Sequence, residues 1–213
     1  MQTRVLVALL FCALAWGGCR SAYYSAWEQF GVYKRDLLKK KVTAARDDQQ
    51  AAAEQFKDAL TRLKELSGFE GGNLEKVYTS LNRDYERSAE RAEAVHKRVR
   101  EVESVAADLF AEWEKEIQEI TTASLRDSSQ QKLRETRRRY EELHTALKRA
   151  EGSMDPVLTR FKDQVLFLKH NLNAAAIASL KGETMNIQGE ISKLLADMNA
   201  AIAQADKFIS TLP

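Results

Sequence analysis

The chain contains little cysteine, proline or glycine: its 213 residues include 2 Cys, 2 Pro and 9 Gly. The rare glycines and prolines leave long uninterrupted helical tracts between them. Charge of one sign is also lacking, because 33 Lys and Arg face 31 Asp and Glu, a net charge of +2. Nucleic-acid binding depends on a clustered basic excess, so we expect no nucleic-acid partner.

The first 18 residues read as a targeting signal. Arg4 precedes an apolar stretch that ends at Gly17-Gly18, directly before Cys19. The stretch is shorter than the roughly 20 apolar residues that a membrane-spanning helix needs. It resembles a bacterial lipoprotein signal, from which Trp16 departs because an aliphatic residue is usual there. We therefore expect residues 1–18 to be removed as a signal peptide and Cys19 to carry a lipid.

The alternative is ordinary cleavage after Ala15 or Gly17, which leaves an unlipidated secreted protein with a free thiol. Cys12 leaves with the leader under either scheme, so the remaining chain must fold without an internal disulfide.

Apolar residues recur at alternating steps of three and four, the spacing of a heptad seam. The predicted helices are about 22–67, 73–123, 128–171 and 174–210, and the polar slots in their seams are Gln49, Ser88, Thr136 and Thr184. The first seam consists of Leu38, Val42, Ala45, Gln49, Ala52, Phe56, Ala59, Leu63 and Leu66.

The ends of these helices carry turn and capping signals. Asn73 suits an N-cap, and Ser128 to Gln131 suits a capping box after a turn at 124–129. The heptad register continues past Pro156, which favours a kinked helix over a break. For the last turn we prefer Asn171 to Asn173, where Asn tolerates a left-handed backbone, and Ser179 to Gly182 is the alternative.

Long helices joined by short turns predict an all-α fold, an elongated antiparallel four-helix bundle with coiled-coil-like packing. At 1.5 Å per residue the longest helix would reach roughly 75 Å, so the single domain at 19–213 is a rod. The alternative is a pair of helical hairpins that complete their core with another chain.

Two Glu-x-x-His pairs, Glu93 with His96 and Glu141 with His144, invite comparison with di-iron bundles. Both pairs lie one position off the seam, and the seams of the first and fourth helices hold no carboxylate. The histidines are then solvated flank residues. Because no phosphate loop, zinc spacing or nucleophile elbow is present either, we predict no metal, no cofactor, no small-molecule substrate, no catalytic residues and no enzymatic activity.

Two surface patterns are candidates for binding. The basic cluster Arg134 to Arg139 suits a solvated face laced with weak ion pairs, and the alternative is contact with an anionic headgroup, a cell-wall polymer or an acidic partner.

Aromatic residues near Cys19 are followed by basic residues, a combination typical of a membrane interface. The predicted interface residues are Tyr23, Tyr24, Trp27, Lys34 and Arg35. Packing of Trp27 and Phe30 at the end of the bundle is the alternative.

Several segments resemble an uncharacterised family of bacterial envelope proteins: YYSAWEQFGVYKRDLL, RDDQQAA from Arg46, YERSAERA from Tyr85, RETRRRY from Arg134 and DQVLFLKHNLNAAAIASL from Asp163. The resemblance covers nearly all of the chain after Cys19 and implies a lipoprotein. Since Arg20 follows the cysteine, known sorting patterns imply the periplasmic face of the outer membrane. The resemblance supplies no activity and no catalytic residues.

The sequence thus predicts a non-enzymatic periplasmic lipoprotein that acts as an envelope scaffold, spacer or adaptor. Its expected partners are the membrane, through the lipid anchor, and an envelope protein or cell-wall component. The alternative is a holdase chaperone for unfolded envelope proteins, and a di-iron enzyme ranks below both.

Overall fold

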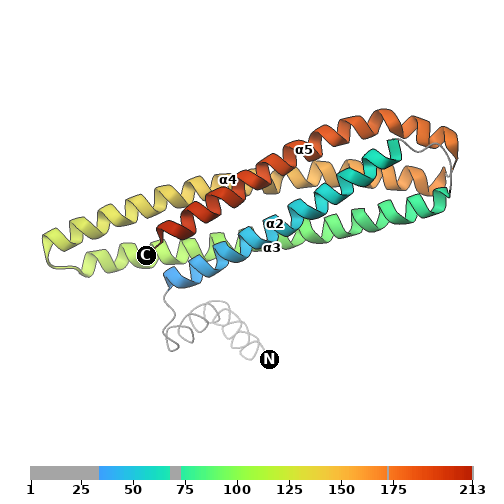
Figure 1. Ribbon diagram of the computed structural model, residues 1–213. Helices are drawn as coiled ribbons and strands as arrows, with labels where there is room; N and C mark the ends of the chain where they lie inside the picture. Colours follow the sequence, from blue (N-terminus) through green and yellow to red (C-terminus); the bar gives the residue numbers. More distant parts are fainter. Residues whose placement is uncertain (1–33, 68–72, 172, 213) are drawn as a thin grey trace, which may run out of the picture.

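The computed structural model describes residues 34–67, 73–171 and 173–212, and these form four helices with no strand among them (Figure 1). The helices are α2 (Lys34–Ser67), α3 (Leu74–Glu119), α4 (Ala123–His170) and α5 (Ala174–Thr211). No described helix is both long and apolar enough to cross a membrane. At 1.5 Å per residue, the 48 residues of α4 extend about 72 Å.

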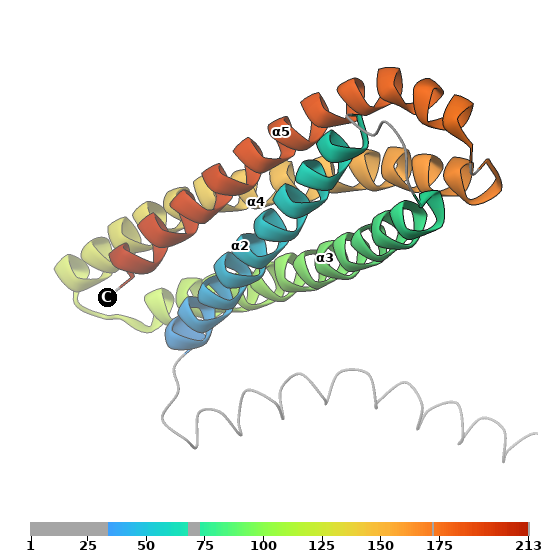
Figure 2. The same ribbon diagram turned by 45° about the vertical axis from the view of Figure 1, so that its right-hand side comes forward.

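Each helix packs against its neighbours in sequence, and α2 also packs against α5, so the four close into a bundle (Figures 1 and 2). Successive helices run antiparallel. The predicted all-α antiparallel bundle is confirmed, and the seams of all four helices pack within one chain. The core therefore does not need a second chain to complete it.

The predicted seam forms this core. On α2, every described seam position is at most 1% exposed, and this includes the polar Gln49. On α3, Ser88 is fully buried in the same way, whereas Trp113 is half-buried. The side chains of Leu66, Ile177, Leu180 and Thr184 lie outside what the structure describes.

The ends of α2 and α3 follow the predicted signals at the first turn. α2 ends at Ser67, and the Asn73 Oδ1 accepts a hydrogen bond of 3.0 Å from the backbone N–H of Lys76, as an N-cap does. Residues 22–33 of the predicted first helix lie outside the described residues.

The predicted second turn at 124–129 is wrong. The helices part at 120–122, and Ser128 to Gln131 lies inside α4. Ile120, Thr121 and Thr122 are β-branched, so they have low helix propensity and suit a break. The hydroxyl oxygen of Ser129 does not cap a helix; it accepts a hydrogen bond of 3.0 Å from Trp113 Nε1.

Helix α4 runs without interruption through Pro156, as the preserved register predicts. Proline removes the hydrogen bond to the carbonyl of Gly152, four residues earlier. Because both residues are exposed, water can satisfy that carbonyl.

The last turn lies at the predicted asparagine pair, and α5 continues through Ser179 to Gly182 without the alternative break. Asn171 does not use the left-handed backbone that asparagine tolerates, since its φ is −134°. Asn171 ends α4 with its side chain instead: Nδ2 donates a hydrogen bond of 2.9 Å to the Phe167 carbonyl.

Candidate functional site

Of the predicted site residues, Lys34 and Arg35 lie at the end of the rod where α2 begins. Cys19, Tyr23, Tyr24 and Trp27 fall outside the described residues, so lipidation and interface contact there stay predictions. Lys34 and Arg35 form the first turn of α2 and are described.

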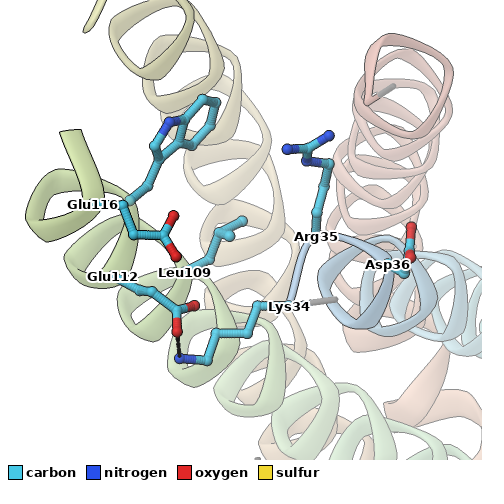
Figure 3. Close-up of a pocket in the computed structure, with 7 residues that line it drawn as sticks. Lys34, Arg35, Asp36, Leu109, Glu112 and Glu116 are labelled. Carbon is cyan, nitrogen blue, oxygen red and sulfur yellow. Dashed lines mark ion pairs between the residues drawn. The ribbon is translucent and has the colours of Figure 1, made fainter. Parts of the chain in front are cut away.

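Lys34 and Arg35 line a hollow of about 290 Å³ between α2 and α3 (Figure 3). The Lys34 ammonium lies 2.9 Å from the Glu112 carboxylate, and its side chain is only 15% exposed. The Arg35 guanidinium lies over the indole ring of Trp113, 5.9 Å from its centre. The remaining lining residues are Asp36, Leu109 and Glu116.

These contacts hold the first turn of α2 on α3. An ion pair and a cation–π contact each contribute about 1 kcal/mol or less at partly exposed positions. None of the seven lining residues is a serine, cysteine or histidine, so the hollow offers no hydroxyl or thiol nucleophile and no imidazole base. Contact of Lys34 and Arg35 with a membrane interface stays a prediction.

A second hollow, of about 230 Å³, lies between α3 and α4 near their turn. It is lined by Glu114, Ile117, Gln118, Gln130, Leu133, Arg134 and Arg137. Arg137 donates a hydrogen bond of 2.8 Å to Glu114, and its guanidinium lies 5.1 Å from the centre of the Phe110 ring.

The basic cluster at 134–139 borders this second hollow and is laced with ion pairs, as predicted for a solvated face. Arg138 reaches Glu142 at 2.7 Å, and Arg139 lies 3.7 Å from Glu135. Arg134 is exposed, and no ion pair joins it to a described acid.

Neither histidine contacts the glutamate three residues before it in its Glu-x-x-His pattern. His96 on α3 contacts carboxylates of α4 instead, with Nδ1 2.9 Å from Glu151 and Nε2 3.2 Å from Asp155. His144 on α4 reaches back to Glu103 on α3 at 2.8 Å. Among the described residues, no group of three or more His, Cys, Asp and Glu side chains is arranged to hold a metal ion.

These histidines belong to a charged network along the α3–α4 boundary. Lys148 pairs with Glu151 and lies 3.9 Å from Glu103, so it joins the two histidine pairs. The His96 side chain is 17% exposed, which corrects its interpretation as a solvated flank residue. The network adds contacts between α3 and α4 outside the seam.

The network shifts the acid–base equilibrium of His96. Burial acts to lower its pKa, but hydrogen bonds to Glu151 and Asp155 outweigh burial, and the pKa is raised above 6.5. The physical reason is that two carboxylates call for two donors, which only the protonated ring provides. Burial acts to raise the Glu151 pKa, but hydrogen bonds from Lys148 and His96 lower it overall.

A raised pKa in the folded state makes bundle stability depend on pH. The contribution of His96 is fully present below the unfolded value of about 6.5 and is lost as the pH rises through the folded value. We expect the free energy of unfolding to fall over that window in the natural chain and to fall less in His96→Gln. Urea unfolding at a series of pH values measures both. His170→Gln, at an exposed position of α4, is the control and keeps the natural dependence.

Polar side chains also occupy the core. Gln49 is 1% exposed, and neither its amide nitrogen nor its amide oxygen has a hydrogen-bond partner in the described structure. Asp84 on α3 is 3% exposed and pairs with Arg62 on α2. Burial raises the pKa of Asp84, and Arg62 opposes that rise.

Sequence reasoning found Gln49 as a polar seam slot and missed Asp84, which stands beside the seam residue Tyr85. The residue that would have indicated a buried Asp84 is its partner Arg62, which comes just before the seam residue Leu63. It becomes a partner for Asp84 only after the antiparallel alignment of α2 and α3 is known.

A family model described as "Protein of unknown function (DUF2959)" matches residues 23–212. No curated protein and no solved structure matches the chain significantly.

Proposed function

The chain belongs to the DUF2959 family, and from that premise we propose that it is a non-enzymatic periplasmic lipoprotein, tethered at Cys19 to the outer membrane. In this proposal the bundle is a scaffold, spacer or adaptor. It carries contact surfaces at its ends and holds them apart by its length.

The observation that carries the proposal is the distribution of exposed large hydrophobic side chains over the rod. Leu125 is in the first turn of α4, and this start of α4 lies at the end of the rod where α2 begins (Figure 1). The others described are Leu166, Phe167 and Met185, which lie toward the α4–α5 turn at the opposite end. Exposed apolar side chains that gather in one place indicate contact with a partner or a membrane.

The flanks between the ends are polar. Ion pairs cross from helix to helix along them, for example Lys41 with Glu101 at 2.9 Å and Arg160 with Glu190 at 3.1 Å. Such pairs contribute little to stability, and they keep the sides of the rod solvated. A rod with polar sides and with its exposed large hydrophobic side chains toward the ends suits a spacer.

The two described hollows support a role without chemistry. Each contains an ion pair between two of its lining residues, Lys34 with Glu112 and Arg137 with Glu114, and neither is lined by a serine, cysteine or histidine. We rank the holdase alternative lower, because the core is filled within one chain and offers an unfolded client no open apolar interior.

Site-specific photocrosslinking in intact cells tests the adaptor role. A photoreactive residue at Phe167 or Met185 should capture an envelope protein or cell-wall component, and one at the exposed flank position Ala196 should not. Equal labelling from the end and the flank, or no adduct from either, contradicts the adaptor role. Suppression of client aggregation by the purified chain would favour the chaperone instead.

A further inference from the structure

The α3–α4 hairpin projects beyond the rest of the bundle. Lys34, at the start of α2, pairs with Glu112, and α3 continues seven residues farther to Glu119, about 10 Å. On the other side, Lys207 near the end of α5 contacts Glu142, which lies well inside α4. Figures 1 and 2 show the hairpin extending past both the start of α2 and the C-terminus.

The projecting part is held together between its two helices. Ile117 is 2% exposed and Leu133 is 7% exposed, although α3 and α4 are the only described helices that reach this level. The Trp113 to Ser129 hydrogen bond adds a tie across the pair. The packing between α3 and α4 therefore fixes the backbone that carries the outer side chains of this tip.

The tip carries an apolar residue and a small basic excess. Leu125, in the first turn of α4, is 61% exposed. Within 117–134 the basic residues Arg126, Lys132 and Arg134 outnumber the acidic Glu119 and Asp127. In a membrane-surface contact, apolar side chains enter the interface and neighbouring cations attract anionic headgroups, and the tip has one residue of the first kind and three of the second.

The second hollow supplies donors for an anionic group at the same tip. Arg134 brings a guanidinium, and Gln118 and Gln130 bring carboxamide groups. Arg137 is engaged with Glu114, which leaves Arg134 as the cation for a phosphate.

We propose that this tip, residues 117–134, is a second membrane contact that seats on anionic phospholipid headgroups. The inference rests on the proposed lipoprotein function. Lys34 lies fifteen positions after Cys19, a span of at most about 50 Å, so a lipid on Cys19 keeps this end near the bilayer. Leu125 enters the boundary between headgroups and acyl chains, and Arg134 binds a headgroup phosphate. The second contact sets the tilt of the rod.

The test uses the full lipidated chain purified from membranes and reconstituted into vesicles that contain phosphatidylglycerol. An environment-sensitive fluorophore is attached at Leu125→Cys, with Met185→Cys at the opposite end as the control. Nitroxide-labelled lipids should quench the probe at 125 strongly and the probe at 185 little. Adding Arg134→Gln should reduce the quenching at 125, and circular dichroism verifies that helicity is retained.

Flotation of the same vesicles in high salt distinguishes failure of the proposed lipid anchor from failure of the tip contact. A chain that fails to float has no lipid anchor, which overturns the proposed function. A chain that floats while its 125 probe stays in water overturns the tip contact alone. Shielding of that probe in native envelopes but not in these vesicles also overturns it, in favour of a protein partner.

Discussion

Phe161→Ala is expected to lower the free energy of unfolding by about 3–5 kcal/mol, the largest effect among the substitutions considered. Phe161 is fully buried in the seam of α4, and its ring packs edge-on against Tyr85 of α3 with ring centres 5.9 Å apart. Truncation removes apolar burial and leaves a cavity that long rigid helices cannot easily close. Chemical denaturation gives the free energy, and the expected fall in Tm is roughly 10 °C.

The chain offers a matched control six residues away on the same helix. Phe167 is 39% exposed, so the same substitution there should change stability by no more than about 0.5 kcal/mol. The hydrogen bond from Asn171 reaches the Phe167 backbone carbonyl and survives the change. Similar losses at both positions would contradict the assignment of the heptad stripe to the core.

Gln49→Met is expected to stabilise the bundle by about 1–3 kcal/mol. Gln49 is buried between Ala45 and Ala52 on the same helix face, and its amide donates and accepts no hydrogen bond within the described structure. Methionine has nearly the same length and lack of branching, so it removes the desolvation cost with little change of volume. Urea denaturation measures the gain.

Gln50→Met is the control, because Gln50 is exposed on the next position of α2 and its replacement should be close to neutral. A loss of stability in Gln49→Met would mean that the amide has a partner, such as a buried water, and that the polar slot contributes to stability. Sedimentation of both variants shows whether the buried amide also selects the single-chain bundle over other assemblies, a role that polar seam residues play in coiled coils.

The α3–α4 turn shows where reasoning from sequence fails. Ser128 to Gln131 has the composition of a capping box, but it does not begin a helix. Ile117, near the end of α3, is buried, and the chain turns just after it at 120–122. The Ser129 hydroxyl could cap a helix or accept a hydrogen bond from Trp113. The position of α3 beside α4 decides that it accepts from Trp113. The prediction of the turn at the asparagine pair is confirmed, because two local signals agree there. Asn173 suits an N-cap, and the alanines that follow it favour a helix.

The candidate site was predictable only in part. Lys34 and Arg35 follow from composition, but their partners Glu112 and Trp113 lie almost 80 residues later in the chain. For His96 and His144 the sequence shows only the local Glu-x-x-His spacing along one helix, which predicts solvated flank residues. Their actual partners, Glu151 and Glu103, come from the facing helix.

By itself the sequence determined the helices and the stripe of each that is buried, because a heptad seam is a local, repeated property of neighbouring residues. The tertiary structure decided which residues meet across helices: the Arg62–Asp84 pair, the histidine network and the projecting α3–α4 tip. Those contacts depend on the axial alignment of one helix against the next. Turn lengths and side-chain packing set that alignment. The heptad pattern does not specify it, because the pattern looks the same after each seven-residue shift of one helix along the next.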